Sequence, residues 1–159
     1  MLFRSDRSVG RVMARLEAEG IADNTIVVLS SDNGGADYIG IDGINAPYRG
    51  WKNTFFEGGL RVPMSISWPG KIPPGTRIDA PVNHLDLMPT LVAAGGGTLP
   101  DDREIDGRDM APLFTGADRL DRPQDAMFWG SGDYRMVLAG GWKLQINPRS
   151  EEHTSELQS

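Results

Sequence analysis

The spacing of apolar residues predicts two helices. After Asp6, apolar side chains recur at intervals of three and four residues and Gly20 follows where a C-terminal cap belongs, so that one helical face carries Val9, Val12, Met13 and Leu16. The same spacing returns in residues 83–94. Because proline is tolerated only in the first turn of a helix, Pro89 places the start of this regular helix at about Asp86.

Short apolar runs predict strands. Residues 25–30 (TIVVLS) are apolar on both faces, which favours a central parallel strand that is covered on each side. Residues 62–68 form a second run, ended by a Pro-Gly pair. Three further runs follow later, and the last two meet at Gly140 and Gly141, which suits a tight hairpin turn; they are AMFWG (126–130), YRMVLAG (134–140) and WKLQINP (142–148).

The order of these elements predicts an α/β fold. A helix that leads into a buried strand is half of an α/β crossover unit, whereas the short strands near the end of the chain suit a small antiparallel subdomain. Between the first two predicted strands, residues 31–59 lack a clear period and are rich in Gly, Asn, Asp and aromatic residues. Loops of this length are uncommon in compact domains and are often functional.

Composition indicates a soluble, globular chain and excludes several classes. Its 159 residues include 39% hydrophobic and 24% charged residues, enough for one modest domain with a core. A formal net charge of -6 without clustered Lys or Arg argues against a nucleic-acid surface. No run reaches the roughly 18–20 apolar residues that a membrane span requires. Cysteine is absent, which excludes disulfides and thiolate metal sites within this chain.

The two ends of the chain differ from the rest. Residues 149–159 (RSEEHTSELQS) lack apolar periodicity and resemble the translation of a common short-read sequencing adapter. Residues 1–5 (MLFRS) resemble the reverse complement of such an adapter. The alternatives are an ordinary polar tail and a chance pentapeptide. We therefore leave both segments out of the fold prediction and expect the natural ends to be missing, so that His153 carries no chemistry.

Asp32 and Asn33 are the first candidates for chemistry. They directly follow the predicted strand 25–30, and ligands of open α/β sheets bind beyond the carboxyl ends of the strands. A carboxylate and an amide carbonyl are hard oxygen donors that suit calcium or magnesium, and Gly34 and Gly35 permit turns that a Cβ would resist. The alternative is an Asx turn in an ordinary loop, which is the more frequent case for these residues alone.

A second motif favours the metal-site interpretation over the Asx turn. Residues 48–63 read YRGWKNTFFEGGLRVP and, taken with SSDNGG (30–35), resemble the downstream half of the sulfatase family. In that family a strand ending in Asp-Asn-Gly precedes a segment of the form R-G-x-K-x-T-x-x-E-G-G-x-R-V-P. The matching positions here are Arg49, Gly50, Lys52, Thr54, Glu57, Gly58, Gly59, Arg61, Val62 and Pro63. Further blocks agree in the family's order: WPGKI (68–72), HLDLMPTLVAAGG (84–96) and YRMVLAGGWKLQIN (134–147).

This resemblance implies a fold and its boundaries. The chain would form part of an alkaline-phosphatase-like α/β/α sandwich. Residues 6–122 would be the C-terminal part of the catalytic α/β domain and residues 123–148 the start of the antiparallel C-terminal subdomain, flanked by the adapter segments 1–5 and 149–159. Family resemblance also implies a periplasmic or secreted protein.

The resemblance further implies roles for three residues. Asp32 and Asn33 would be two of the protein ligands of a divalent cation, usually calcium, and Lys52 would bind the sulfate group. A sulfate ester gathers negative charge on its oxygens as the S–O bond breaks, and a cation together with an ammonium group offsets it. A solvated surface lysine is the alternative for Lys52.

Other motif residues are expected to shape the site. We expect Glu57 and Arg61 to form an ion pair that orders the loop, and the glycines 58–59 to serve backbone geometry. His84 is expected to cap its helix or to pack, because the family's catalytic histidines lie upstream. Residues 101–109 (DDREIDGRD) are expected to be a solvated acidic loop. Three aromatic residues would either line the substrate mouth or pack: Tyr48, Trp51 and Phe55.

The nucleophile of the family is not in this chain. Sulfatases use a formylglycine, made from the Cys or Ser of a C/S-x-P-S/A-R motif, and two further aspartates on the metal, all upstream. The resemblance therefore implies the C-terminal part of an arylsulfatase-type sulfuric ester hydrolase, acting on small-molecule or glycan sulfate esters, and we expect the chain alone to be inactive. The rivals are a phosphodiesterase or phosphonate monoester hydrolase of the same superfamily and a non-catalytic carbohydrate-binding or interaction module.

Overall fold

The computed structural model describes residues 2–146. The larger part of the fold contains, in chain order, α1 (Leu2–Ala18), β1 (Val27–Ser30), α2 (Glu57–Leu60), β2 (Met64–Ser67), α3 (Leu87–Ala94) and α4 (Ala111–Phe114). Three strands follow: β3 (Ala126–Ser131), β4 (Tyr134–Ala139) and β5 (Trp142–Ile146). Short 3-10 turns connect these elements: η1 (Ala22–Asn24), η2 (Asp37–Ile39), η3 (His84–Asp86) and η4 (Pro123–Asp125).

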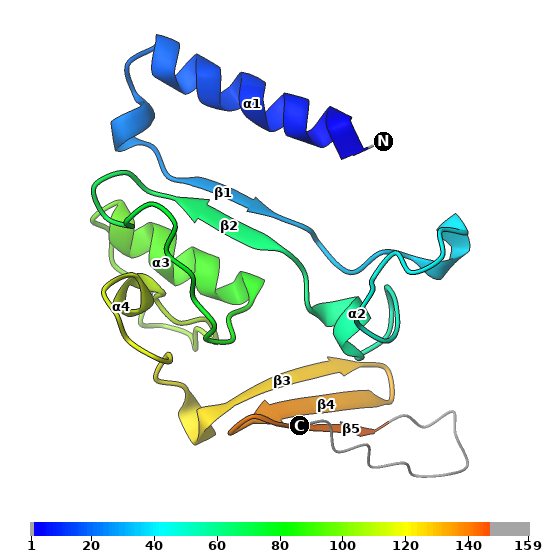
Figure 1. Ribbon diagram of the computed structural model, residues 1–159. Helices are drawn as coiled ribbons and strands as arrows, with labels where there is room; N and C mark the ends of the chain where they lie inside the picture. Colours follow the sequence, from blue (N-terminus) through cyan, green and yellow to red (C-terminus); the bar gives the residue numbers. More distant parts are fainter. Residues whose placement is uncertain (1, 147–159) are drawn as a thin grey trace.

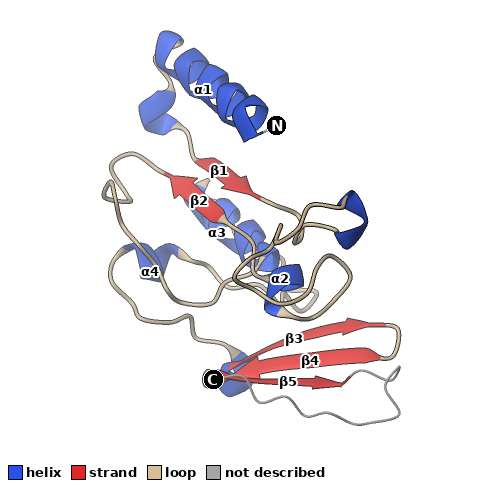
Figure 2. Ribbon diagram, turned by 45° about the vertical axis from the view of Figure 1, so that its right-hand side comes forward, coloured by secondary structure: helices blue, strands red, loops and turns tan. Residues whose placement is uncertain are grey.

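The strands form two separate antiparallel sheets. β1 pairs with β2, from Val27 opposite Ser67 to Ser30 opposite Met64, and β3, β4 and β5 form a meander in chain order. Helices α1 and α3 lie on opposite sides of the β1–β2 sheet, while the three-stranded sheet lies beyond α2 (Figures 1 and 2). The predicted α/β part followed by a small antiparallel sheet is confirmed.

The prediction of a central parallel strand at residues 25–30 is wrong about the direction of the strand. β1 runs antiparallel to β2, and within residues 2–146 it has no second neighbouring strand. Leu29 is accordingly 51% exposed. An apolar run shows that a strand is suited to burial, but its direction and partners depend on which segment of the chain lies beside it, and local pattern does not encode that.

The hydrophobic core lies between β2, α3 and α4. Its buried members come from α4 and its flanks, and residues of β2 and the start of α3 pack against them. Trp68 and Phe114 meet edge to face, with 6.3 Å between ring centroids. The four-residue helix α4 and the residues beside it thus supply the buried side chains of this core: Met110, Leu113, Phe114 and Leu120.

Several element ends follow the predictions. Pro89 is the third residue of α3, inside the first turn as expected. Gly140 and Gly141 join β4 to β5 with φ of 53° and 82°, as a two-residue hairpin turn requires. α1 begins at Leu2 instead of Asp6, and the assignment of residues 1–5 to an adapter stays a prediction. Residues 149–159, with His153, lie outside the described range. Within that range, no helix has the length and apolar character needed to cross a membrane.

Candidate functional site

Backbone hydrogen bonds join the two segments that the sequence singled out. The N–H of Gly34 donates to the carbonyl oxygen of Gly59 (3.0 Å), and the N–H of Lys52 donates to the carbonyl oxygen of Gly35 (3.1 Å). The Asp-Asn-Gly turn at the end of β1 and residues 49–59 therefore form one unit. We call this unit the motif junction.

Glycine is needed where the backbones cross at the motif junction. A Cβ on Gly34 would lie 1.7 Å from the carbonyl oxygen of Gly58, and a Cβ on Gly58 would lie 2.3 Å from the carbonyl oxygen of Gly50. Gly58 and Gly59 are both buried in α2. Since no side chain fits at such distances, the interpretation of residues 58–59 as backbone positions is confirmed.

Asn45 stabilises the motif junction and was not foreseen from the sequence. Its side-chain Oδ1 accepts a hydrogen bond from the N–H of Gly35 (2.7 Å). Its Nδ2 donates to the carbonyl oxygens of Gly35 (2.9 Å) and Gly50 (3.0 Å). One half-buried amide thus connects the turn after β1 to the start of residues 49–59. The only sequence signal was an Asn within a Gly- and Pro-containing loop, which is too common to be specific.

The fold does not use the side chains of Asp32 and Asn33. Asp32 is exposed and Asn33 is half-buried. The turn is instead stabilised by Ser31, whose Oγ donates to the carbonyl oxygen of Asn33 (2.9 Å). Among the described residues neither Asp32 nor Asn33 makes a side-chain hydrogen bond or ion pair, so an Asx turn is not what shapes this loop.

Lys52 is half-buried, in contrast to a freely solvated surface lysine. The turn that follows it is closed by Thr54, whose hydroxyl donates to the carbonyl oxygen of Trp51 (2.7 Å). Within residues 2–146 no carboxylate pairs with the Lys52 ammonium group. The backbone of Lys52 is therefore fixed beside the Asp-Asn-Gly turn while the described chain leaves its charge unneutralised.

Glu57 has a partner that the sequence did not reveal. Its Oε1 accepts a hydrogen bond from Lys143 Nζ at 2.7 Å, whereas its Oε2 lies 3.9 Å from Arg61 Nη1. The expected Glu57–Arg61 ion pair is present, but it is the longer of the two. Arg61 also lies over the ring of Tyr48, 5.0 Å from its centroid. The sequence separation of 86 residues explains why Lys143 was missed.

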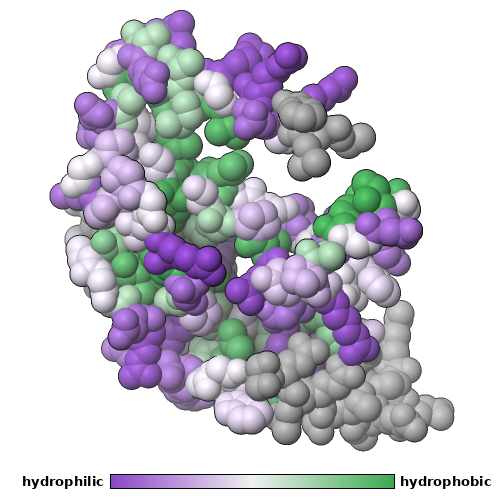
Figure 3. Space-filling view, viewed as in Figure 1, coloured by the Kyte–Doolittle hydropathy of each residue, from purple (hydrophilic) through white to green (hydrophobic). Residues whose placement is uncertain are grey.

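The aromatic candidates divide into two groups. Phe55 packs edge to face on Tyr134 of β4, with 6.2 Å between centroids, and is therefore a packing residue. Tyr48 and Trp51 are 37% and 46% exposed and line a surface cavity of about 460 Å³ formed by Asp37 and residues 40–51. Apolar side chains gather over the same loop around η2 in Figure 3, where Tyr38, Ile39 and Ile41 are exposed.

His84 contacts the end of β1. Its Nε2 lies 3.1 Å from the Oγ of Ser30, and the ring is exposed. The helix cap is Asn83, whose side chain accepts a hydrogen bond from the N–H of Leu85 (2.7 Å). Of the two expected roles of His84, the cap is therefore taken by Asn83, and the His84 ring instead contacts Ser30. A one-dimensional pattern cannot show that η3 and the end of β1 lie side by side.

Comparison with known proteins decides the family. The family model for the sulfatases matches residues 1–97, which is more than half of the chain. The chain belongs to the sulfatase family. It spans only about a fifth to a quarter of the length of the curated sulfatases that it matches.

Individual sulfatases support this assignment. Steryl-sulfatase of Rattus norvegicus is 44% identical over 117 residues, covering 70% of this chain and 20% of that protein. N-acetylgalactosamine-6-sulfatase of Canis lupus familiaris is 38% identical over 138 residues, covering 86% of this chain and 26% of that protein. The crystal structure of Ps i-CgsB in complex with k-i-k-neocarrahexaose is 31% identical, with a TM-score of 0.80 over 94% of this chain and 34% of that chain.

Two adjacent residues of this sulfatase chain carry donor groups of the kind that a divalent cation takes. Adjacent carboxylate and amide oxygens on Asp32 and Asn33 suit calcium, which takes about six to eight oxygen ligands. Among the described residues, no group of three or more His, Cys, Asp or Glu side chains could hold a metal ion. The donors present are therefore of the right kind but too few, and a complete site would need ligands from beyond these residues.

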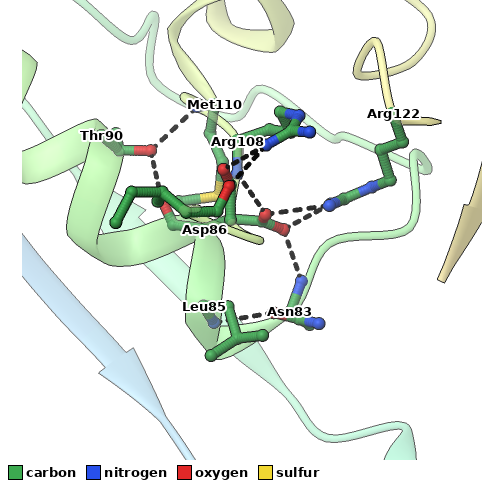
Figure 4. Close-up of polar contacts among 9 residues, drawn as sticks. Asn83, Leu85, Asp86, Thr90, Arg108, Met110 and Arg122 are labelled. Atoms are coloured by element: carbon green, nitrogen blue, oxygen red, sulfur yellow. Dashed lines mark hydrogen bonds and ion pairs between the residues drawn. The ribbon is translucent and has the colours of Figure 1, made fainter. Parts of the chain in front are cut away.

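A second polar cluster lies outside the motif junction, around Asp86. The Asp86 carboxylate is fully buried and accepts hydrogen bonds from the backbone N–H groups of Asn83 and Arg108 (2.8 Å each). Arg122 donates to both carboxylate oxygens, at 3.0 and 2.5 Å (Figure 4). Thr90 extends the cluster by donating to the Asp86 carbonyl oxygen at 2.6 Å. The cluster ties the start of α3 to the segment before β3.

Residues 101–109 are only partly the solvated acidic loop that was expected. Arg103 donates two hydrogen bonds to Asp102 (2.8 Å each), which lowers the pKa of this exposed carboxyl. Gly107, however, is buried, and a Cβ there would lie 2.0 Å from the carbonyl oxygen of Leu85. The second half of the loop packs through its backbone, which the side-chain charge pattern does not show.

Proposed function

We propose that this chain forms one side of the active site of an arylsulfatase-type sulfuric ester hydrolase. The observation that carries the proposal is the motif junction, in which the Gly34–Gly59 and Lys52–Gly35 hydrogen bonds join the Asp-Asn-Gly turn to the lysine segment of a sulfatase-family chain. The candidate side chains thus belong to one unit that is held by its backbone. None of them is consumed by the fold in the described part of the chain.

The proposed roles follow from the chemistry of sulfate esters. Asp32 and Asn33 would hold a divalent cation, and calcium fits their hard oxygen donors best. Such a cation would supply positive charge near the sulfate oxygens. Lys52 would bind the same group, because negative charge on these oxygens grows as the S–O bond breaks. The half-burial of Lys52 supports this role, since charges attract more strongly away from bulk water.

The nucleophile would come from outside this chain. By family resemblance it is a formylglycine from an upstream Cys or Ser, accompanied by two further metal-binding aspartates. The partial coverage of the curated sulfatases agrees with such an arrangement. We use "full-length enzyme" for this chain joined to the upstream part that its relatives carry. The full-length enzyme would be the active species, and the chain alone would be inactive.

The proposed substrates are sulfate monoesters of small molecules or glycans. Matching proteins carry the names steryl-sulfatase and N-acetylgalactosamine-6-sulfatase, and Ps i-CgsB was solved with neocarrahexaose. The cavity of about 460 Å³ beside Tyr48 and Trp51 offers an open surface to either class. A periplasmic or secreted location, implied by family resemblance, belongs to the same proposal.

Two other functions are less well supported. A phosphodiesterase or phosphonate monoester hydrolase of the same superfamily shares the metal-binding architecture, but the complete motif around Lys52 favours sulfate. A non-catalytic carbohydrate-binding or interaction module has no need of Asp32, Asn33 and Lys52 together, all left without side-chain partners among the described residues.

Aryl sulfate hydrolysis by the full-length enzyme tests the proposal. Lys52→Ala should lower kcat/KM by about a hundredfold or more, as expected for loss of one charge aimed at the transition state. Lys71→Ala removes an exposed lysine and serves as the matched control. Asp32→Ala should raise the calcium concentration needed for half-maximal activity, measured by titration of the metal-free enzyme.

Three outcomes would contradict the proposal. If Lys52→Ala and Lys71→Ala kept the same kcat/KM, Lys52 would not bind the sulfate. A wild-type enzyme that prefers an aryl phosphodiester to an aryl sulfate would support the phosphodiesterase. Binding of a sulfated glycan without any turnover would support the non-catalytic module.

A further inference from the structure

Lys143 is a buried charge whose recorded partner is Glu57. Its side chain on β5 is 8% exposed, and its Nζ donates to Glu57 Oε1 at 2.7 Å. Lysine is almost never this buried unless it is paired. A buried charge without its partner is strongly unfavourable, so the position of Lys143 fixes where the Glu57 carboxylate must lie.

Glu57 connects this pair to the motif junction. It is the first residue of α2, and the two buried glycines follow it directly. The N–H of Gly58 donates to the carbonyl oxygen of Arg49 (2.7 Å), and the carbonyl oxygen of Gly59 accepts the hydrogen bond from Gly34. A displacement of Glu57 would therefore move the backbone that holds both the Asp-Asn-Gly turn and the lysine segment.

A second contact also holds the segment around Glu57 in place. Phe55, two residues before Glu57, packs edge to face on Tyr134, the first residue of β4. The three-stranded sheet thus holds residues 55–57 at two points, one on β4 and one on β5, and Figure 1 shows α2 between this sheet and the rest of the fold. Arg61 does not replace Lys143, because it is 3.9 Å from Glu57 and its side chain is 61% exposed.

We propose that Lys143 is a positioning residue for the sulfatase site. By holding Glu57, it sets the place of α2 and through it the places of Asn33 and Lys52. The three-stranded sheet then stabilises the site through α2 without touching substrate. This inference rests on the proposed function for its kinetic consequence and on the hydrogen bonds above for its structural one.

Lys143→Met in the full-length enzyme tests the inference. Methionine fills a similar volume, and the Glu57 carboxylate, 34% exposed, can be solvated, so the fold should survive. We expect kcat/KM for an aryl sulfate to fall about ten- to a hundredfold, because small displacements of positioning groups have effects of this size. The calcium concentration for half-maximal activity should rise as well. Lys71→Met, the same change at an exposed lysine, should alter neither value.

The double variant shows whether the pair acts as a unit. Glu57→Gln should lower kcat/KM at least as much as Lys143→Met, since it leaves the lysine buried without a carboxylate. The Lys143→Met/Glu57→Gln enzyme should lose no more than the worse single variant. A double variant whose loss of kcat/KM equals the product of the two single losses would overturn the inference. So would a Lys143→Met enzyme with a lower Tm but unchanged kcat/KM and calcium dependence per folded molecule.

Amide hydrogen exchange keeps the inference testable without activity. If the wild-type enzyme hydrolyses no sulfate ester, the proposed function fails, but the exchange rates of the backbone amides can still be compared. Lys143→Met should increase exchange at Gly34, Lys52 and Gly58, whose N–H groups bond across the motif junction, and Lys71→Met should not. Unchanged exchange at these amides in Lys143→Met would overturn the inference.

Discussion

Two polar regions of this chain are built in opposite ways. Around Asp86, buried side chains bond to one another and to backbone, and Arg122 neutralises the carboxylate. At the motif junction, backbone groups bond to one another, and the charged groups of Asp32 and Lys52 have no side-chain partner in the described chain. A region that neutralises its own charges stabilises the fold. A region that fixes its backbone and leaves two charged side chains, Asp32 and Lys52, unpaired among the described residues is suited to bind a ligand.

The contrast separates two aspartates that look alike in the sequence. Asp86 is 0% exposed and serves structure, whereas Asp32 is exposed and serves the proposed metal site. Substitutions in the two regions should therefore have different signatures. Those around Asp86 should change the free energy of unfolding, and those at the motif junction should mainly change catalysis.

The largest effect is expected from Arg122→Met. This change leaves the buried Asp86 carboxylate without its counter-ion and should lower the free energy of unfolding by about 3–5 kcal/mol, measured by urea denaturation of the full-length enzyme. Arg119→Met is the matched control, because the Arg119–Asp125 pair is exposed and should contribute less than about 1 kcal/mol. Equal effects of the two variants would remove the distinction between the regions.

Gly34→Ala should have the next largest effect. Its Cβ would overlap the carbonyl oxygen of Gly58, so the motif junction must open, at about 1–3 kcal/mol of stability and with a clear loss of kcat/KM. Gly10→Ala in α1 is the control, because a Cβ there meets nothing within 4 Å and alanine favours a helix. Wild-type activity in Gly34→Ala would show that the backbone crossing is looser than the structure indicates.

Asn45→Ala should have an intermediate effect. It removes three hydrogen bonds but leaves a half-buried site that water can partly satisfy, so we expect a loss of about 1–2 kcal/mol. The calcium concentration needed for half-maximal activity should rise as stability falls, since the turn after Asn33 is released. Asn24→Ala, at an exposed position, provides the baseline. An Asn45→Ala enzyme that matches Asn24→Ala in both measurements would show that the backbone alone holds the motif junction.

The smallest effect is expected from His84→Ala. The ring is exposed and makes one hydrogen-bond contact, with Ser30, so stability should change by less than about 1 kcal/mol. Aryl sulfate kcat should stay within about twofold of wild type. A hundredfold loss of kcat with an intact fold would show that His84 takes part in catalysis and that the catalytic region extends beyond the motif junction.

Local signals predicted much of the secondary structure. Apolar spacing gave α1 and α3, Pro89 fixed the first turn of α3, and the Gly140–Gly141 pair gave the last hairpin. These features depend on neighbours within a few residues, which the sequence contains directly. The antiparallel direction of β1 and the contribution of α4 to the core depend on distant segments and could not be obtained in this way.

For the candidate site, the sequence alone determined which chemical groups are available. The Asp32-Asn33 pair and the lysine motif identified the sulfatase family, because their residue types and spacing lie within short segments. Only the tertiary structure decided which groups remain unpaired. Asn45, Lys143 and Arg122 meet their partners across loops and subdomains, and such contacts depend on how the chain folds back on itself, not on which residues stand next to one another.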